Sequence, residues 1–258
     1  MKHLALAAVS LAVLACGPAP VAGPTPTTVA TATEGALTVE LLSLKPLAVG
    51  QNRLFYRVTQ GGKPVAEAHL AQHPLMTMPS MKHGCPLVDP AHDANADGLF
   101  EGTVIFNMPS SDMDTWDLSV DVTPHGAAAA TTVSFPKLAV ADSDARRSVT
   151  VNGMTTMVTL GFADGAAKVG ENAYTVSVHR PQDMMKLTWL PVTDLAITAT
   201  PEMPSMGHGS SGNVNPVHRA DGLYDGTVNF SMAGDWVLHL DLKSGDQSLG
   251  TVDYAWNL

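Results

Sequence analysis

Apolar and polar residues alternate with a period of two in short runs along most of the chain. In residues 224–232, every second position is apolar or glycine, and the positions between are Asp, Thr, Asn and Ser. This is the pattern of a half-buried antiparallel strand. Similar runs at 37–44, 53–59, 99–108 and 116–123 are separated by Gly, Pro, Asn and Asp, and no stretch has the period of a long helix. The pattern predicts an all-β fold.

The strand-like runs occur twice in the same order. Residues 97–108 read DGLFEGTVIFNM, and residues 221–232 read DGLYDGTVNFSM. Further matches join Val49-Gly50-Gln51-Asn52 to Val169-Gly170-Glu171-Asn172, Pro90-Ala91-His92 to Pro216-Val217-His218, and Trp116-Asp117-Leu118 to Trp236-Val237-Leu238. Each copy contains enough short strands for two packed sheets. The sequence therefore predicts two tandem immunoglobulin-like β-sandwich domains, at 35–140 and 146–258, joined by a polar segment near 141–147.

One loop is also present twice, and it carries the candidate chemistry. Residues 78–84 read MPSMKHG and residues 203–209 read MPSMGHG. Proline at the second position and glycine at the seventh favour a loop. Thioether sulfur and imidazole together suit copper, above all Cu(I). The alternative is that these methionines cap the open end of a small core, because Met commonly fills gaps.

The predicted copper ligands follow from the repeated loop and the repeated Pro-x-His. They are Met78, Met81, His83 and His92 in the first copy, and Met203, Met206, His208 and His218 in the second. His92 and His218 are included to close each site from the next turn, and the alternative for both is an exposed loop histidine. Met108 and Met232 fall on the apolar face of their strands and are expected in the core, as are Trp116 and Trp236. Cys85, two residues after His83, is a ligand or a passive residue.

The N-terminus predicts export. Lys2 precedes the apolar run 4–14, which is too short to span a bilayer and ends in small residues. Residues 1–16 therefore read as a signal peptide, and Val13-Leu14-Ala15-Cys16 resembles a bacterial lipobox in which Cys16 is lipidated; a plain signal peptide is the alternative. Residues 17–34, rich in Pro, Thr and Ala, are expected to form an extended tether. The expected localisation is the cell envelope, lipid-anchored at the outer membrane and facing the periplasm.

The charge of the chain and its weaker motifs argue against several kinds of partner, metal site and catalytic activity. A formal net charge of -10 argues against nucleic acid and anionic lipid as partners. The run 93–98 begins like a calcium loop, but Val104 stands where a bidentate Glu is required. Zinc is disfavoured because its sites prefer thiolate, imidazole and carboxylate donors. No nucleophile with a base, catalytic carboxylate pair or phosphate loop has a recognisable context, so the chain is not expected to be an enzyme.

The ordered motifs resemble a known family. Met-Pro-x-Met-x-His, a Gly-Leu-aromatic-x-Gly-Thr-Val strand, a Met at its end and a Trp-led strand occur in both halves and resemble the YtkA-like domain family, the FixH group. The resemblance implies exported or membrane-anchored β-sandwich domains associated with copper handling and assembly of copper-containing oxidases. The chain departs from the FixH pattern in having a lipid-type anchor and two domains.

Together these features predict an exported, lipid-anchored copper-binding protein that acts as a chaperone, buffer or resistance factor. Its expected partners are a metal ion, a copper protein, and the membrane through the anchor only. Two alternatives remain open: a cell-surface protein-interaction module that binds no metal, and an accessory factor in copper oxidase assembly.

Overall fold

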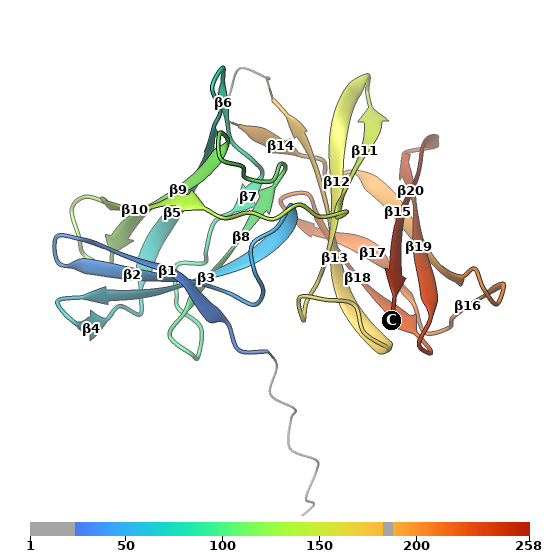
Figure 1. The fold of residues 1–258 in the computed structure, drawn as a ribbon, viewed down its shortest axis with the longest axis horizontal. Helices are drawn as coiled ribbons and strands as arrows, with labels where there is room; N and C mark the ends of the chain where they lie inside the picture. Colours follow the sequence, from blue (N-terminus) through green and yellow to red (C-terminus); the bar gives the residue numbers. More distant parts are fainter. Residues whose placement is uncertain (1–23, 183–187) are drawn as a thin grey trace, which may run out of the picture.

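The alternating runs form strands throughout the part of the chain that the computed structural model describes, residues 24–182 and 188–258 (Figure 1). No helix occurs among these residues, and so none there could span a membrane. The strands form four antiparallel sheets, which pair into two β-sandwiches. The predicted all-β fold of two tandem domains is confirmed. The predicted signal peptide, the predicted lipidation site Cys16 and the first part of the expected tether lie outside the described residues.

The first domain is a sandwich of two sheets. One sheet has the order β1-β2-β3-β8-β7, with β4 also paired to β3, and the other has the order β10-β9-β5-β6. The strands are β1 (Thr27–Glu34), β2 (Leu37–Ser43), β3 (Gly50–Gln60), β4 (Lys63–Pro64), β5 (Ala68–Thr77), β6 (Lys82–His83), β7 (Leu87–Val88), β8 (Phe100–Phe106), β9 (Thr115–Pro124) and β10 (Thr131–Leu138). The orders β2-β3-β8-β7 and β5-β9-β10 correspond to the A-B-E-D and C-F-G sheets of an immunoglobulin constant domain.

The second domain repeats this arrangement. Its sheets have the orders β11-β12-β13-β18-β17, with β14 paired to β13, and β16-β15-β19-β20. The strands are β11 (Arg146–Val151), β12 (Met154–Phe162), β13 (Gly170–Pro181), β14 (Trp189–Pro191), β15 (Leu195–Met203), β16 (His208–Gly209), β17 (Val214–Ala220), β18 (Leu223–Phe230), β19 (Asp235–Ser244) and β20 (Gln247–Asn257). Trp116 and Trp236 are fully buried at matching positions in the two cores, as the sequence predicts.

The repeated Val-Gly-x-Asn motif is a structural turn. The Asn52 side chain accepts a hydrogen bond from the Ala48 amide at 3.1 Å and donates to the carbonyls of Ala48 and Gly50 at 2.7 and 2.8 Å. Asn172 makes the same three bonds in the second domain. Gly50 has a φ of 97°, a conformation that favours glycine. The motif therefore fixes the entry to the strand that follows it.

The tether prediction is wrong for residues 27–34. They form β1, which pairs along its length with β2, from Thr27 opposite Ser43 to Glu34 opposite Leu37. Threonine and valine favour strands, and backbone pairing at a sheet edge does not require apolar side chains. Ala30 and Ala32 also pack against the first core. Low hydrophobicity alone was therefore a poor guide to this segment.

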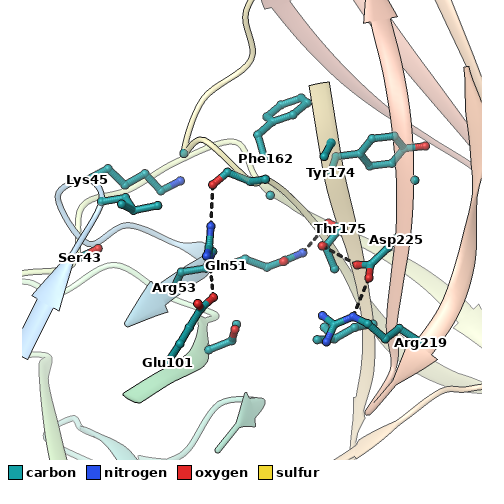
Figure 2. Close-up of a pocket in the computed structure, with 18 residues that line it drawn as sticks. Ser43, Lys45, Gln51, Arg53, Glu101, Phe162, Tyr174, Thr175, Arg219 and Asp225 are labelled. Carbon is teal, nitrogen blue, oxygen red and sulfur yellow. Dashed lines mark hydrogen bonds and ion pairs between the residues drawn. The ribbon is translucent and has the colours of Figure 1, made fainter. Parts of the chain in front are cut away.

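Side chains from the first domain hold the second directly. The Gln51 amide donates to the carbonyls of Thr159 and Thr175 at 3.1 and 2.8 Å, and the Arg53 guanidinium bridges Glu101 and the Ala163 carbonyl (Figure 2). Near Gln51, a cavity of about 480 Å³ lies between the domains.

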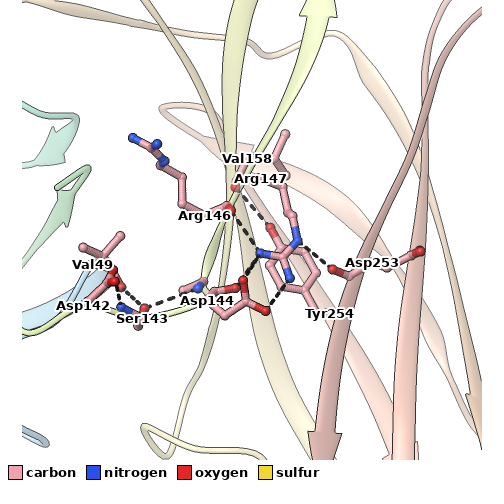
Figure 3. A network of polar contacts seen from close by, with 10 residues as sticks. Val49, Asp142, Ser143, Asp144, Arg146, Arg147, Val158, Asp253 and Tyr254 are labelled. Atoms are coloured by element: carbon pink, nitrogen blue, oxygen red, sulfur yellow. Dashed lines mark hydrogen bonds and ion pairs between the residues drawn. The ribbon is translucent and has the colours of Figure 1, made fainter. Parts of the chain in front are cut away.

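The segment that joins the domains is also fixed. Ser143 donates to the Val49 carbonyl at 2.7 Å, and Arg147 binds the Asp144 carboxylate and the Asp253 carbonyl while its guanidinium lies 4.8 Å from the centre of the Tyr254 ring (Figure 3).

Candidate functional site

The first methionine loop is a tight β-hairpin between β5 and β6. The Met78 amide donates to the Met81 carbonyl at 3.0 Å, and Met76 lies opposite His83. Opposite residues in an antiparallel pair share a face, and so do alternate residues on one strand. Met76, Met78, Met81 and His83 therefore lie on one face of the hairpin. Met76 is buried in the core, Met78 is partly buried against it, and Met81 is 44% exposed.

The histidine of this hairpin is held in one orientation. Its Nδ1 lies 2.9 Å from the Gly84 carbonyl oxygen, which can only accept, so Nδ1 carries the hydrogen. Its Nε2 is buried and has no hydrogen-bond partner. The ring stands edge-on to Trp116 with 5.4 Å between centroids. His83 is thus fixed by its neighbours with one ring nitrogen left unused.

A groove of about 440 Å³ runs past the hairpin toward the second domain. Met81, His83 and Met108 line it from the first domain, and Met157 lines it from β12 of the second. The Trp116 indole donates to the Met108 carbonyl at 2.9 Å, and the same indole ring lies edge-on to the His83 ring. Three thioethers and one imidazole therefore border a single space.

The second methionine loop is a wider hairpin between β15 and β16. Met203 lies opposite His208, and the amides of Met206 and Gly207 both approach the Met203 carbonyl, at 3.1 and 2.9 Å. Gly207, with a φ of 63°, permits this four-residue turn, whereas the first copy has Lys82 there. Met203 is 1% exposed and Met206 is 62% exposed. Met203 therefore packs in the core, as the capping interpretation expects, while Met206 does not.

The second histidine repeats the geometry of the first. The Nδ1 of His208 lies 2.9 Å from the Gly209 carbonyl oxygen, and its ring lies 6.1 Å from that of Trp236. The indole of Trp236 donates to the Met232 carbonyl at 2.9 Å. Met232 itself is 42% exposed, so the expectation that it lies in the core is wrong: it follows the end of β18.

The structure does not bring His92 to the first hairpin. The His92 carbonyl accepts from the Ala68 amide, at the start of β5, whereas Met76 and the hairpin lie at the end of that strand. Eight residues of strand span about 26 Å. His92 instead faces His125, with 6.3 Å between ring centroids. It cannot close a metal site on the methionine loop.

His218 is equally distant from the second hairpin. It lies opposite Tyr224, whose hydroxyl accepts from the Leu195 amide at 3.2 Å. Leu195 begins β15, and Met203 ends it, again about 26 Å away along the strand. The repeated Pro-x-His motif therefore belongs to the opposite end of each domain from the repeated hairpin, and the prediction that these histidines close the sites is corrected.

Cys85 is part of the first core. Burial raises the pKa of its thiol well above the usual value, although a backbone hydrogen bond with Ile105 acts in the opposite direction. A thiol must lose its proton to serve as a strong metal ligand. The passive interpretation of Cys85 is therefore the better one.

The predicted ligand set omits three methionines near the first hairpin. Met76 lies opposite His83, Met108 lies on the groove, and Met157 comes from the other domain. The sequence places Met108 on the apolar face of its strand and gives no signal for Met157, because nothing in the sequence indicates which part of the second domain faces the first hairpin. Among residues 24–182 and 188–258, no group of three His, Cys, Asp or Glu is placed to hold a metal ion. A metal site at the hairpins would therefore depend on thioethers.

Comparison with known proteins gives one family match. A family model described as YtkA-like matches residues 31–111 and 148–241, one segment in each domain. No curated protein matches the chain. Domains 5-6 of the S-layer protein SbsC align with 15% identity over 90% of this chain and 97% of that one, with a TM-score of 0.30. Domains 4-9 of the same protein align with 14% identity over 90% and 31%, with a TM-score of 0.26. Both scores are too low to bear on fold or function.

Proposed function

Because the chain belongs to the YtkA-like family, with one matched segment in each domain, we propose that it is an exported, lipid-anchored protein that binds Cu(I) at its two Met/His hairpins. Its role would be that of a copper chaperone, buffer or resistance factor. The ligands would be Met81 and His83 in the first domain, and Met206 and His208 in the second. Met78 and Met203, at the base of each loop, would contribute sulfur where their packing allows it.

The observation that carries this proposal is the unused ring nitrogen of His83. Histidines that bind metals usually donate their other N–H to a carbonyl or carboxylate, which fixes the ring and its tautomer. Both hairpin histidines make that bond, each to the glycine that follows it. A buried nitrogen without a partner is costly, and a cation would satisfy it. The residues present therefore fit a metal.

The surrounding donors favour copper over harder metals. Thioethers are soft, uncharged ligands that suit Cu(I), whereas calcium and magnesium require oxygen and zinc prefers thiolate, imidazole or carboxylate. The four proposed ligands are uncharged when they bind. With a monovalent cation, each site would therefore carry only a single positive charge, which does not require carboxylates to compensate it. Bound copper would be held in the one oxidation state that thioethers stabilise best.

The test is a competition between the full protein and a colorimetric Cu(I) chelator. The wild-type protein is expected to retain up to two equivalents. His83→Ala should weaken binding at one site by about tenfold or more. His73→Ala, which replaces an exposed histidine on the neighbouring strand β5, should change nothing. Met81→Leu keeps the side-chain volume and removes the lone pairs, so binding should fall while the fold survives.

The same experiment separates the alternatives. If a folded protein retained less than about half an equivalent, or if His83→Ala and His73→Ala bound copper equally, the copper proposal would be wrong. Exposed Met206 and Met232 would then be better explained as part of a surface that contacts another protein.

A further inference from the structure

The first hairpin differs from the second in being covered by the other domain. In Figure 1, β6 lies close to β14, whereas β16 lies at the far end of the second domain. The indole of Trp189, in β14, donates to the Gly84 carbonyl at 3.2 Å. This is the carbonyl that also accepts from Nδ1 of His83. The second domain therefore helps to position the first histidine.

Two buried acceptors without partners line the groove between hairpin and second domain. One is Nε2 of His83, and the other is Oδ1 of Asn107. The Asn107 side-chain nitrogen donates to the Gly84 carbonyl at 3.4 Å, so the other atom of this amide, the unpartnered one, is the oxygen. A cation bound in the groove would satisfy a histidine nitrogen or an amide oxygen that lacks a donor.

Met157 brings a thioether from the second domain to this groove. It lies on β12, is buried, and packs against Ile105 of the first domain and Leu223 of the second. Its position on the groove with Met81, His83 and Met108 adds a third soft donor to a space that already holds the two unpartnered acceptors.

The charge at the groove selects among cations. Arg146 lines the groove and donates to the Asn107 carbonyl at 2.7 Å, and no carboxylate lines the groove among the described residues. A nearby guanidinium repels a divalent ion twice as strongly as a monovalent one. Neutral donors beside a fixed positive charge therefore favour a soft monovalent cation.

We propose that the first hairpin and the second domain form one composite site for a soft monovalent cation, Cu(I) or Ag(I), in which Met157 joins Met81, His83 and Met108 as a ligand. This rests on the proposed function and extends it, because the site would exist only while the domains are docked. The second hairpin, which has no such cover, would hold its metal within one domain.

The experiment uses the full protein with the second hairpin disabled by Met206→Leu and His208→Ala. In this background Cu(I) affinity is measured for Met157→Leu and for Met154→Leu, a matched control on the same strand but outside the groove. X-ray absorption at the copper edge counts the sulfur neighbours of the bound metal. Met157→Leu should weaken binding about tenfold or more and remove one sulfur neighbour, whereas Met154→Leu should do neither.

Each other outcome has a distinct meaning. If the background protein binds Cu(I) and Met157→Leu leaves affinity unchanged, the composite site is refuted and the proposed function stands. Weaker binding with an unchanged sulfur count would refute Met157 as a ligand and leave it a packing residue. If the background protein binds no Cu(I) although it is folded, the proposed function fails at the first hairpin.

Discussion

Replacing Asn172 by alanine tests whether the repeated Val-Gly-x-Asn turn stabilises each domain. The change removes three hydrogen bonds, to the Lys168 amide at 2.9 Å and to the carbonyls of Lys168 and Gly170 at 2.7 and 2.8 Å. The side chain is 4% exposed, so water does not readily replace it. At about 1 kcal/mol for each bond, the expected loss in free energy of unfolding is about 3 kcal/mol.

The assay is urea denaturation of the full protein followed by circular dichroism, with each domain's transition treated separately because two domains need not unfold together. Asn52→Ala removes the equivalent bonds in the first domain and should destabilise that domain by a similar amount. Asn257→Ala, at an exposed position, is the control and should have little effect. A loss below about 1 kcal/mol for Asn172→Ala would refute the claim that this side chain holds the turn.

Three further predictions concern charge, packing and anchoring. Burial lowers the pKa of His239, but hydrogen bonds and charges from Asp253 and Glu202 raise it by more, so the net pKa lies above the usual value. The stabilisation that the protonated imidazole gains from these carboxylates should be complete below the pKa of His239 in the unfolded chain, about 6.5, and should be lost as the pH rises through its higher pKa in the folded protein. The urea midpoint of the wild-type protein should therefore fall over this pH range, and the midpoint of His239→Gln should not show that fall. A Cβ at Gly226 would lie 2.8 Å from a carbonyl oxygen of β17, so Gly226→Ala should lower the free energy of unfolding by about 1 to 3 kcal/mol, measured by urea denaturation. Cys16→Ser should release the protein from the membrane fraction or leave an unprocessed precursor, and a processed variant that still fractionated with membranes would contradict lipid anchoring.

The strands and their repetition could be predicted because both are visible in the sequence without knowing which strands pair in space. Alternation places a residue on one face of a strand whatever the neighbouring strand is, and the burial of Trp116 and Trp236 follows from it. The duplicated loops were identified for the same reason: proline and glycine act on the backbone within a few residues. Strand residues 27–34 were missed because edge pairing depends on backbone hydrogen bonds, which leave little trace in hydrophobicity.

The composition of the candidate site was harder to predict because it depends on which strand ends meet in space. His92 is only nine residues from His83, yet β5 places them about 26 Å apart. Met157 is 74 residues from His83 by sequence number and lines the same groove. Repetition also misled, since the two hairpins share a sequence but differ in register: His83 lies opposite Met76, whereas His208 lies opposite Met203.

Binding of a soft metal by the hairpins, through thioether sulfur and imidazole nitrogen, can be measured by X-ray absorption at the copper edge on the Cu(I)-loaded, desalted full protein. We expect both sulfur and imidazole nitrogen in the first coordination shell, with the nitrogen contribution reduced in His83→Ala and the sulfur contribution reduced in Met81→Leu. A first shell of oxygen and nitrogen only, or a sulfur signal unchanged when Met81 and Met206 are both replaced by leucine, would contradict binding through thioether sulfur.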